Sequence, residues 1–109
     1  MSTPLKIKDI SEPPRKLRGE RYTSREFAVR EWESVWAQSW LLVCRADEIP
    51  GSGDFIVEEI GSESILVVRQ DDESIRAFYN VCQHRGNRLV NTSEGSMASF
   101  TCAYHSWKY

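Results

Sequence analysis

The sequence has no apolar run long enough to cross a membrane and no excess of positive charge. A membrane-spanning helix needs about 20 apolar residues, and the first residues, Met1-Ser2-Thr3-Pro4-Leu5-Lys6, lack the apolar core of a secretory signal. The chain carries 14 lysines and arginines against 16 aspartates and glutamates, a formal net charge of -2. Proteins that follow the phosphate backbone of nucleic acids usually have a basic excess. We therefore expect neither a membrane nor a nucleic acid as a partner, and we place the protein in the cytoplasm.

Cysteine and histidine are also scarce, because the 109 residues contain three cysteines and two histidines. An odd number of cysteines does not suit a secreted disulfide framework, and a reducing compartment fits better. Two of the cysteines and both histidines lie between residues 82 and 105. The third cysteine, Cys44, lies in an apolar run, and we interpret it as a packed thiol without a functional role.

The N-terminal third of the chain predicts one helix after an extended segment. Residues 1–20 carry three of the four prolines and many charges, which indicates an extended lead-in. Thr23 and Glu26 form a capping-box pattern, and apolar residues then recur at helical spacing as far as Trp36. We predict a helix over residues 24–39, with its tryptophans in the core. The remaining residues, 21–109, are expected to form one domain.

The middle of the chain has the pattern of β-structure. The apolar run at residues 40–44 predicts a buried strand, and a short strand is also expected at residues 98–101. Three β-branched runs predict an antiparallel meander at residues 55–60, 64–70 and 75–80. The predicted fold class is therefore mainly β with one N-terminal helix. The predicted strand at residues 75–80 leads directly to Cys82, and the one at residues 98–101 leads directly to Cys102.

Two short motifs carry every cysteine and histidine of the second half of the chain. The first is Cys82-Gln83-His84-Arg85-Gly86, and the second is Cys102-Ala103-Tyr104-His105-Ser106-Trp107. Thiolate and imidazole suit zinc or an iron-sulfur cluster. Structural zinc sites of Cys2His2 type commonly pair two cysteines on one element and two histidines on the next, whereas each motif here mixes one of each. A mixed pair of loops suits a binuclear centre with the cysteines on one iron and the histidines on the other.

These motifs resemble those of the Rieske domain of ring-hydroxylating (aromatic) dioxygenase large (alpha) subunits. The resemblance also covers the turn from Asp47 to Phe55, the approach Tyr79-Asn80-Val81 and the end Lys108-Tyr109. It implies a Rieske-type antiparallel β-sandwich that holds a [2Fe-2S] cluster. Cys82 and Cys102 would ligate the inner iron, and His84 and His105 the outer, more exposed iron.

The same resemblance implies an electron-transfer function. A ferredoxin or a flavin reductase would donate electrons, and a mononuclear iron would use them to activate dioxygen on an aromatic or related substrate. The resemblance also implies a homo-oligomeric parent protein. Arg85 and Arg88 could dock an acidic donor, or they could be solvated or paired with scaffold carboxylates. Tyr104 and Trp107 could shield the cluster or simply pack beneath the loop.

The chain departs from the family pattern at two positions. Ala103 stands where the family usually has proline, and Ser106 where it usually has glycine. A serine in a place that needs a positive φ adds strain, although its hydroxyl could also donate a hydrogen bond near the cluster. We favour simple tolerance of both changes. The extra cysteine that each loop carries in the Rieske proteins of respiratory cytochrome bc complexes is also missing, which favours the oxygenase branch.

The sequence also limits the function. A mononuclear iron site of this class needs two histidines and a carboxylate. Both histidines of this chain are already assigned to the cluster, and there is no third one. We therefore expect a Rieske domain truncated at its C-terminal side, which alone is not an oxygenase and holds a cluster weakly or not at all. The alternatives are a stand-alone Rieske-type ferredoxin and a structural Cys2His2 zinc module. The presence of iron with acid-labile sulfide would support either Rieske reading, and one zinc per chain would support the zinc module.

Overall fold

The structure is a computed structural model that describes residues 16–109 in two compact units, one up to Trp40 and one over Leu41–Tyr109. Each unit is described by itself. Most of the predicted lead-in over residues 1–20 lies outside the described residues, and its last residue, Glu20, begins a helix. None of the helices within residues 16–109 is long and apolar enough to cross a membrane.

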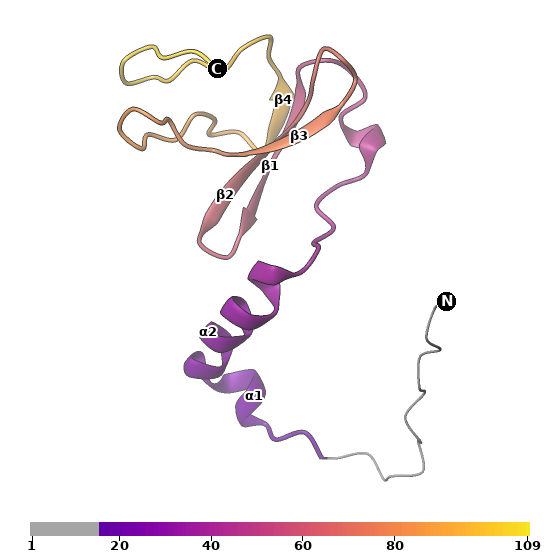
Figure 1. Ribbon diagram of the computed structural model, residues 1–109, viewed down its shortest axis with the longest axis vertical. Coiled ribbons are helices and arrows are strands. Elements are labelled where there is room, and N and C mark those ends of the chain that lie inside the picture. Colours follow the sequence, from indigo (N-terminus) through magenta and orange to yellow (C-terminus); the bar gives the residue numbers. More distant parts are fainter. Residues whose placement is uncertain (1–15) are drawn as a thin grey trace, which may run out of the picture. The chain divides into compact units, whose positions relative to one another are not determined.

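The first unit is helical, with α1 at Glu20–Thr23, α2 at Arg25–Ser34 and the short 3-10 helix η1 at Trp36–Gln38 (Figure 1). The predicted helix is therefore in the right place, but its α-helical part ends five residues early. Its cap is Ser24, whose hydroxyl accepts a hydrogen bond from the Phe27 N–H at 3.2 Å, and not Thr23.

The assignment of the helical tryptophans to a core is wrong. No residue of α2 or η1 is buried, and Trp36 is 50% exposed. Helical spacing identifies which residues share one side of a helix, but it does not specify a surface to cover that side.

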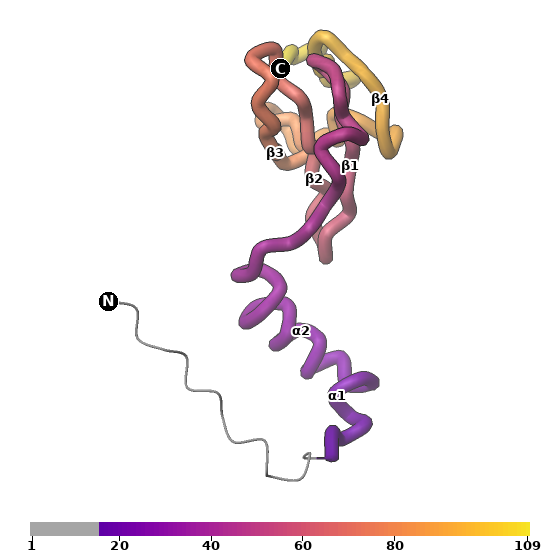
Figure 2. The backbone as a smooth tube through the Cα atoms, turned by 90° about the vertical axis from the view of Figure 1, so that its right-hand side faces the viewer, coloured from indigo at the N-terminus to yellow at the C-terminus, as the bar shows by residue number. Residues whose placement is uncertain are grey.

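The second unit is built on a four-stranded antiparallel sheet with the strand order β3-β2-β1-β4. Its strands are β1 at Asp54–Ile60, β2 at Glu63–Arg69, β3 at Ile75–Tyr79 and β4 at Glu94–Ser96, and the 3-10 helix η2 at Ala46–Glu48 precedes them. The predicted fold class and the three-stranded meander are confirmed. Figure 2 shows β3 and β4 on opposite sides of the central pair, in a sheet that does not close on itself.

Both faces of the central hairpin are covered by apolar side chains. The register places Phe55 opposite Val68 and Val57 opposite Leu66, and these four residues pack with Val90 on one face. On the other face Ile56 and Val67 pack against Ile49. Burial on both faces explains why these strands are continuous apolar runs and do not alternate with polar residues.

Two of the predicted strands are absent from the described residues. Residues 40–44 have no strand structure, and Trp40 and Leu42 are almost fully exposed, while Val43 and Cys44 pack against the Ile49 cluster. Residues 98–101 form only an isolated bridge between Thr101 and Lys108. Apolar character alone did not supply the hydrogen-bonded partner that a strand needs. The burial of Cys44 raises the pKa of its thiol, which agrees with an unreactive role.

Candidate metal centre

The first candidate loop, residues 82–87, follows β3 and is held at its base by Asn80. The side-chain amide of Asn80 donates to the Val90 carbonyl at 2.8 Å, and its Oδ1 accepts from the Val90 N–H at 2.9 Å. Asn80 is 4% exposed, and its own N–H donates to the Ser64 carbonyl of β2 at 2.8 Å. One buried side chain therefore joins the segment before the loop, the segment after it and the sheet.

The second candidate loop, residues 102–107, is the tip of a hairpin. Phe100 and Tyr109 exchange two backbone hydrogen bonds, of 3.0 and 2.9 Å, below the Thr101–Lys108 bridge. Both arms of the loop are therefore held by backbone pairing.

The two loops share one backbone pattern. The N–H of each cysteine donates to the carbonyl five residues later, Cys82 to Asn87 at 2.7 Å and Cys102 to Trp107 at 2.8 Å. The N–H of the residue four positions later donates back to the cysteine carbonyl, from Gly86 and from Ser106, each at 2.9 Å. Gly86 and Ser106 occupy the left-handed region, with φ of 73° and 58°. The positive φ suspected at Ser106 is thus present.

The loops lie side by side at one end of the sheet (Figure 1) and bring the four candidate ligands together in two pairs. Cys82 and Cys102 are each 2% exposed, whereas His84 and His105 are exposed. The two imidazole rings are neighbours, with centroids 4.7 Å apart. The centre therefore has a buried thiol side and an exposed imidazole side.

Each buried sulfur has a hydrogen-bond partner from the opposite loop or its arm. The Tyr109 hydroxyl lies 3.3 Å from Cys82 Sγ and accepts from the Gln83 N–H at 2.9 Å. The Asn87 Nδ2 lies 3.8 Å from Cys102 Sγ. Hydrogen bonding from Tyr109 is the largest cause that lowers the pKa of the Cys82 thiol, and the Cys102 thiol adds to it, so both sulfurs are in one small region. A lower pKa favours the thiolate, which is the form that binds metal.

Aromatic side chains flank the imidazoles. The Trp107 ring stacks on His84, with centroids 4.8 Å apart and an angle of 8° between the planes. The Tyr104 ring lies 3.9 Å from that of His105, and the Arg85 guanidinium lies 5.9 Å from the Tyr104 centroid. Tyr104 and Trp107 are themselves 59% and 47% exposed. Each of these two aromatic rings therefore contacts one of the histidines.

The two arginines of the first loop region differ in their contacts. Arg88 forms an ion pair with Glu59 of β1 and donates to the Val90 carbonyl at 3.0 Å. The hydrogen bond from Arg88 to the Glu59 carboxylate, together with a weaker contribution from the Ser64 hydroxyl, lowers the pKa of Glu59. Arg85 has no carboxylate partner within residues 16–109. Of the two readings for these arginines, scaffold pairing holds for Arg88, and Arg85 remains available to a partner.

The donor arrangement distinguishes between the possible metals. In the part of the chain that the structure describes, no three histidine, cysteine, aspartate or glutamate side chains are grouped to hold one metal ion. A structural zinc ion needs four ligands around one centre. In a [2Fe-2S] cluster of mixed ligation each iron takes two protein ligands, because sulfide supplies the others. The separate thiol and imidazole pairs fit such a cluster.

Three residues that support this centre were not predicted from the sequence as functional candidates, namely Asn80, Asn87 and Tyr109. The two asparagines bracket the first motif at its two ends, and a polar residue just outside a ligand loop is a signal for a backbone clamp. Tyr109 carries no such local signal, because its contact with Cys82 joins residues 27 positions apart.

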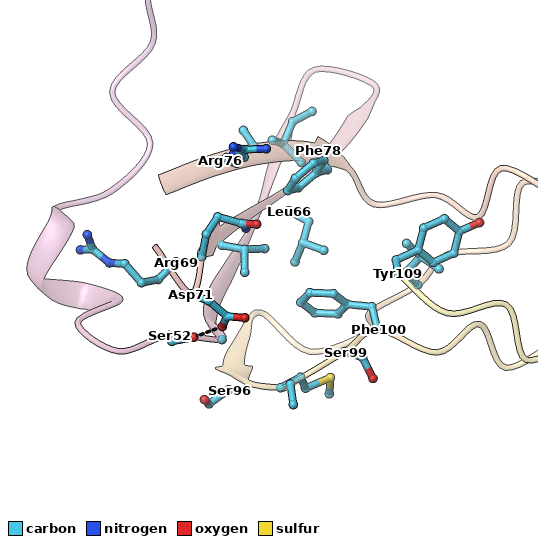
Figure 3. A pocket seen from close by; sticks show the side chains of 18 of the residues that line it. Ser52, Leu66, Arg69, Asp71, Arg76, Phe78, Ser96, Ser99, Phe100 and Tyr109 are labelled. Atoms are coloured by element: carbon cyan, nitrogen blue, oxygen red, sulfur yellow. Dashed lines mark hydrogen bonds between the residues drawn. The ribbon is translucent and has the colours of Figure 1, made fainter. Parts of the chain in front are cut away.

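A separate hollow of about 1360 Å³ lies between strands β2 and β3 and the segment before the second loop. Figure 3 shows Leu66 and Phe78 on one side of it and Phe100 on the other, with Ser52 hydrogen-bonded to Asp71 at a polar end. None of the four candidate ligands lines it, although Tyr109 does. The hollow therefore adjoins the metal centre at Tyr109 and does not contain the candidate ligands.

Comparison with known proteins extends over the whole of the second unit. Residues 39–109 match the family model described as the Rieske [2Fe-2S] domain. The chain is 36% identical over 108 residues to the biphenyl dioxygenase subunit alpha of Metapseudomonas furukawaii, covering 98% of this chain and 24% of that protein. It is 42% identical over 84 residues to the large oxygenase component of the naphthalene 1,2-dioxygenase system of Pseudomonas aeruginosa, covering 77% of this chain and 19% of that protein.

A solved structure with the same fold is the apo form of the quaternary ammonium Rieske monooxygenase CntA. It matches with a TM-score of 0.78 and 36% identity, over 83% of this chain and 26% of that chain. The chain thus spans about a quarter or less of the length of these relatives.

Proposed function

This chain belongs to the Rieske [2Fe-2S] domain family, whose cofactor is a Rieske-type [2Fe-2S] cluster, and we propose that its two motif cysteines and two histidines hold that cluster. In this proposal the inner iron is held by Cys82 and Cys102, and the outer iron by His84 and His105. The observation that carries it is the separation of a buried thiol pair from an exposed imidazole pair on two adjacent loops.

When bound, such a cluster accepts and releases one electron at a potential of about -150 to +300 mV. The protein's own residues set the conditions for this exchange. The buried side excludes water from the sulfurs, where Tyr109 and Asn87 supply hydrogen bonds in its place. The exposed imidazole edges offer the shortest path from the protein surface to the centre, and Trp107 keeps the His84 ring in a fixed orientation.

We further propose that the domain serves a ring-hydroxylating oxygenase. Its relatives include alpha subunits and large components of dioxygenase systems, and a Rieske monooxygenase has the same fold. Both histidines of this chain are assigned to the cluster, so the mononuclear iron that uses the electrons is placed outside this chain. A homo-oligomeric parent protein in the cytoplasm fits these relatives and the free thiols of the chain.

The electron donor in this proposal is a ferredoxin or a flavin reductase with an acidic docking surface. Arg85 supports this, because it directly follows the candidate ligand His84 in the sequence and has no carboxylate partner in residues 16–109. A cation beside the exposed imidazoles would attract an acidic partner to the side from which electrons enter.

The test is electron transfer into the cluster-loaded protein. A reduced [2Fe-2S] ferredoxin is mixed with the oxidised protein, and the change in the visible spectrum is followed by stopped flow. We expect one electron per chain to be taken up, and the same rate to fall at least tenfold in Arg85→Glu at low ionic strength. A cluster that chemical reductant reduces but ferredoxin does not would contradict the electron-entry role.

A further inference from the structure

The hydrogen bonds to the two buried sulfurs cross between the loops in both directions. Tyr109, just after the second loop, contacts the cysteine of the first, and Asn87, at the end of the first loop, contacts the cysteine of the second. Asn87 is half-buried, and Cys102 is 2% exposed. Water cannot readily take the place of the asparagine at that sulfur.

We propose that Asn87 is a positioning residue of the metal centre: its side-chain amide donates a hydrogen bond to the Cys102 sulfur, joins the two loops and raises the reduction potential. This rests on the proposed [2Fe-2S] ligation. The inference comes from the contacts of this one side chain.

The geometry of Asn87 accounts for both of its amide hydrogens. One hydrogen is used in the bond from Nδ2 to the Arg88 carbonyl, at 2.9 Å. A primary amide has two N–H donors, so the second is available to the Cys102 sulfur 3.8 Å away. The backbone carbonyl of Asn87 is held by the Cys82 N–H at 2.7 Å, which fixes the point from which the side chain starts. One residue thus contacts both cysteines, the first through its backbone and the second through its side chain.

The direction of the effect follows from charge. Reduction adds an electron to a group that already shares the negative charge of two thiolates. An N–H dipole directed at a thiolate stabilises the more negative, reduced state more than the oxidised one, and the low polarity of a buried site strengthens this. Loss of the donor therefore lowers the reduction potential. A purely structural role in the turn, through the bond to Arg88 alone, would change stability and leave the potential unaltered.

The first experiment measures the midpoint potential of the cluster-loaded protein by spectroelectrochemistry in Asn87→Leu and Asn87→Ala. Leucine keeps the approximate shape without charge or donor. We expect the reduction equilibrium constant to fall by about threefold to tenfold in both, and a tenfold change is about 59 mV for a one-electron couple. The matched control is Asn91→Leu, because Asn91 is exposed and its side chain has no hydrogen bond to any part of residues 16–109. An unchanged potential in both Asn87 variants would overturn the proposal.

A second measurement does not depend on the stability of the variants. Asparagine labelled with ¹⁵N only at its side-chain amide is incorporated into the wild-type protein, and pulsed EPR is recorded on the reduced cluster. We expect a hyperfine coupling from one labelled nitrogen, and its absence would contradict the sulfur contact. If the wild type gives no [2Fe-2S] signal at all, the proposed function fails. If it gives that signal without the asparagine coupling, only the role of Asn87 fails.

Discussion

Asn80 is the one polar residue that is buried among residues 16–109. It satisfies both backbone groups of Val90 and so closes the first loop without a metal. Replacement by alanine would leave the buried Val90 N–H unpaired and would remove one of the two hydrogen bonds to the Val90 carbonyl, which Arg88 also donates to. An unpaired buried group costs about 1–3 kcal/mol, and the lost hydrogen bond adds about 1 kcal/mol.

For Asn80→Ala we therefore expect the free energy of unfolding to fall by about 2–4 kcal/mol, with partial loss of the cluster. Urea unfolding of the metal-free protein measures the first effect, and iron content after purification measures the second. Asn91→Ala serves as the exposed control. Equal stability of Asn80→Ala and wild type would show that the clamp contributes nothing.

Ser106 occupies a left-handed conformation, with φ of 58°, where its counterpart in the first loop is Gly86. A residue with a Cβ is destabilised by roughly 1–2 kcal/mol in this region. Glycine avoids that strain, but it loses more conformational entropy on folding, which offsets part of the benefit. In the described residues the Ser106 side chain has no hydrogen bond, which favours tolerance over a tuning role.

We expect Ser106→Gly to raise the free energy of unfolding by about 1 kcal/mol or less and to leave the reduction potential unchanged. The reverse change, Gly86→Ser, should lower stability by about 1–2 kcal/mol. Thermal unfolding and potentiometry of the same samples measure both. A clear drop of the potential in Ser106→Gly would instead assign the hydroxyl a role at the cluster.

At the scale of elements, β4 shows how packing forms a strand that its residues do not favour. Glu94-Gly95-Ser96 has little β-propensity, yet Gly95 pairs with Phe55 of β1. A Cβ at Gly95 would lie 2.8 Å from the Phe55 ring, so the glycine is needed for the ring to pack under the strand. Phe55 is 1% exposed and is central to its core cluster.

Gly95→Ala should therefore lower the free energy of unfolding by about 1–3 kcal/mol through overpacking. Gly19→Ala is the matched control, because a Cβ there meets no atom within 4 Å. Denaturant unfolding of both variants makes the comparison. Equal stability of the two would show that the Phe55 ring has room to move aside.

The elements differ in how far the sequence predicted them. β1, β2 and β3 could be predicted because β-branched residues and polar turns mark them locally. β4 could not, since only its pairing with β1 makes it a strand. The run at residues 40–44 misled for the opposite reason: it is apolar, but in the described residues only Val43 and Cys44 find a core to pack against.

At the scale of the whole molecule, we expect substitution of Arg88 to affect mainly stability and substitution of Arg85 to affect mainly the rate of electron transfer. Arg88→Gln breaks the ion pair with Glu59, and since exposed pairs contribute little we expect only a small loss of thermal stability. Arg85→Gln should leave stability unchanged and slow reduction by an acidic ferredoxin, with a weaker dependence of the rate on salt. Stopped-flow reduction at several ionic strengths makes the comparison. If Arg88→Gln slowed the reduction more than Arg85→Gln does, the docking role would belong to Arg88 and the prediction would be wrong.

The candidate ligands could be predicted from the sequence because their spacing within each motif is local. The residues that support them could not, because Asn87 reaches Cys102 and Tyr109 reaches Cys82 only after the two loops are brought together by the sheet. The preference for two irons over one zinc rested in the sequence on the mixture of one cysteine and one histidine in each motif, and the structure adds a buried thiol pair and an exposed imidazole pair.

The most direct test of the two-plus-two ligation is pulsed EPR of the reduced, cluster-loaded protein grown with ¹⁵N-histidine, together with iron and acid-labile sulfide analysis. The label is unambiguous because the chain has only His84 and His105. We predict two irons and two sulfides per chain and strong couplings from two histidine nitrogens. One zinc per chain, or an iron-sulfur signal without histidine coupling, would contradict the assignment.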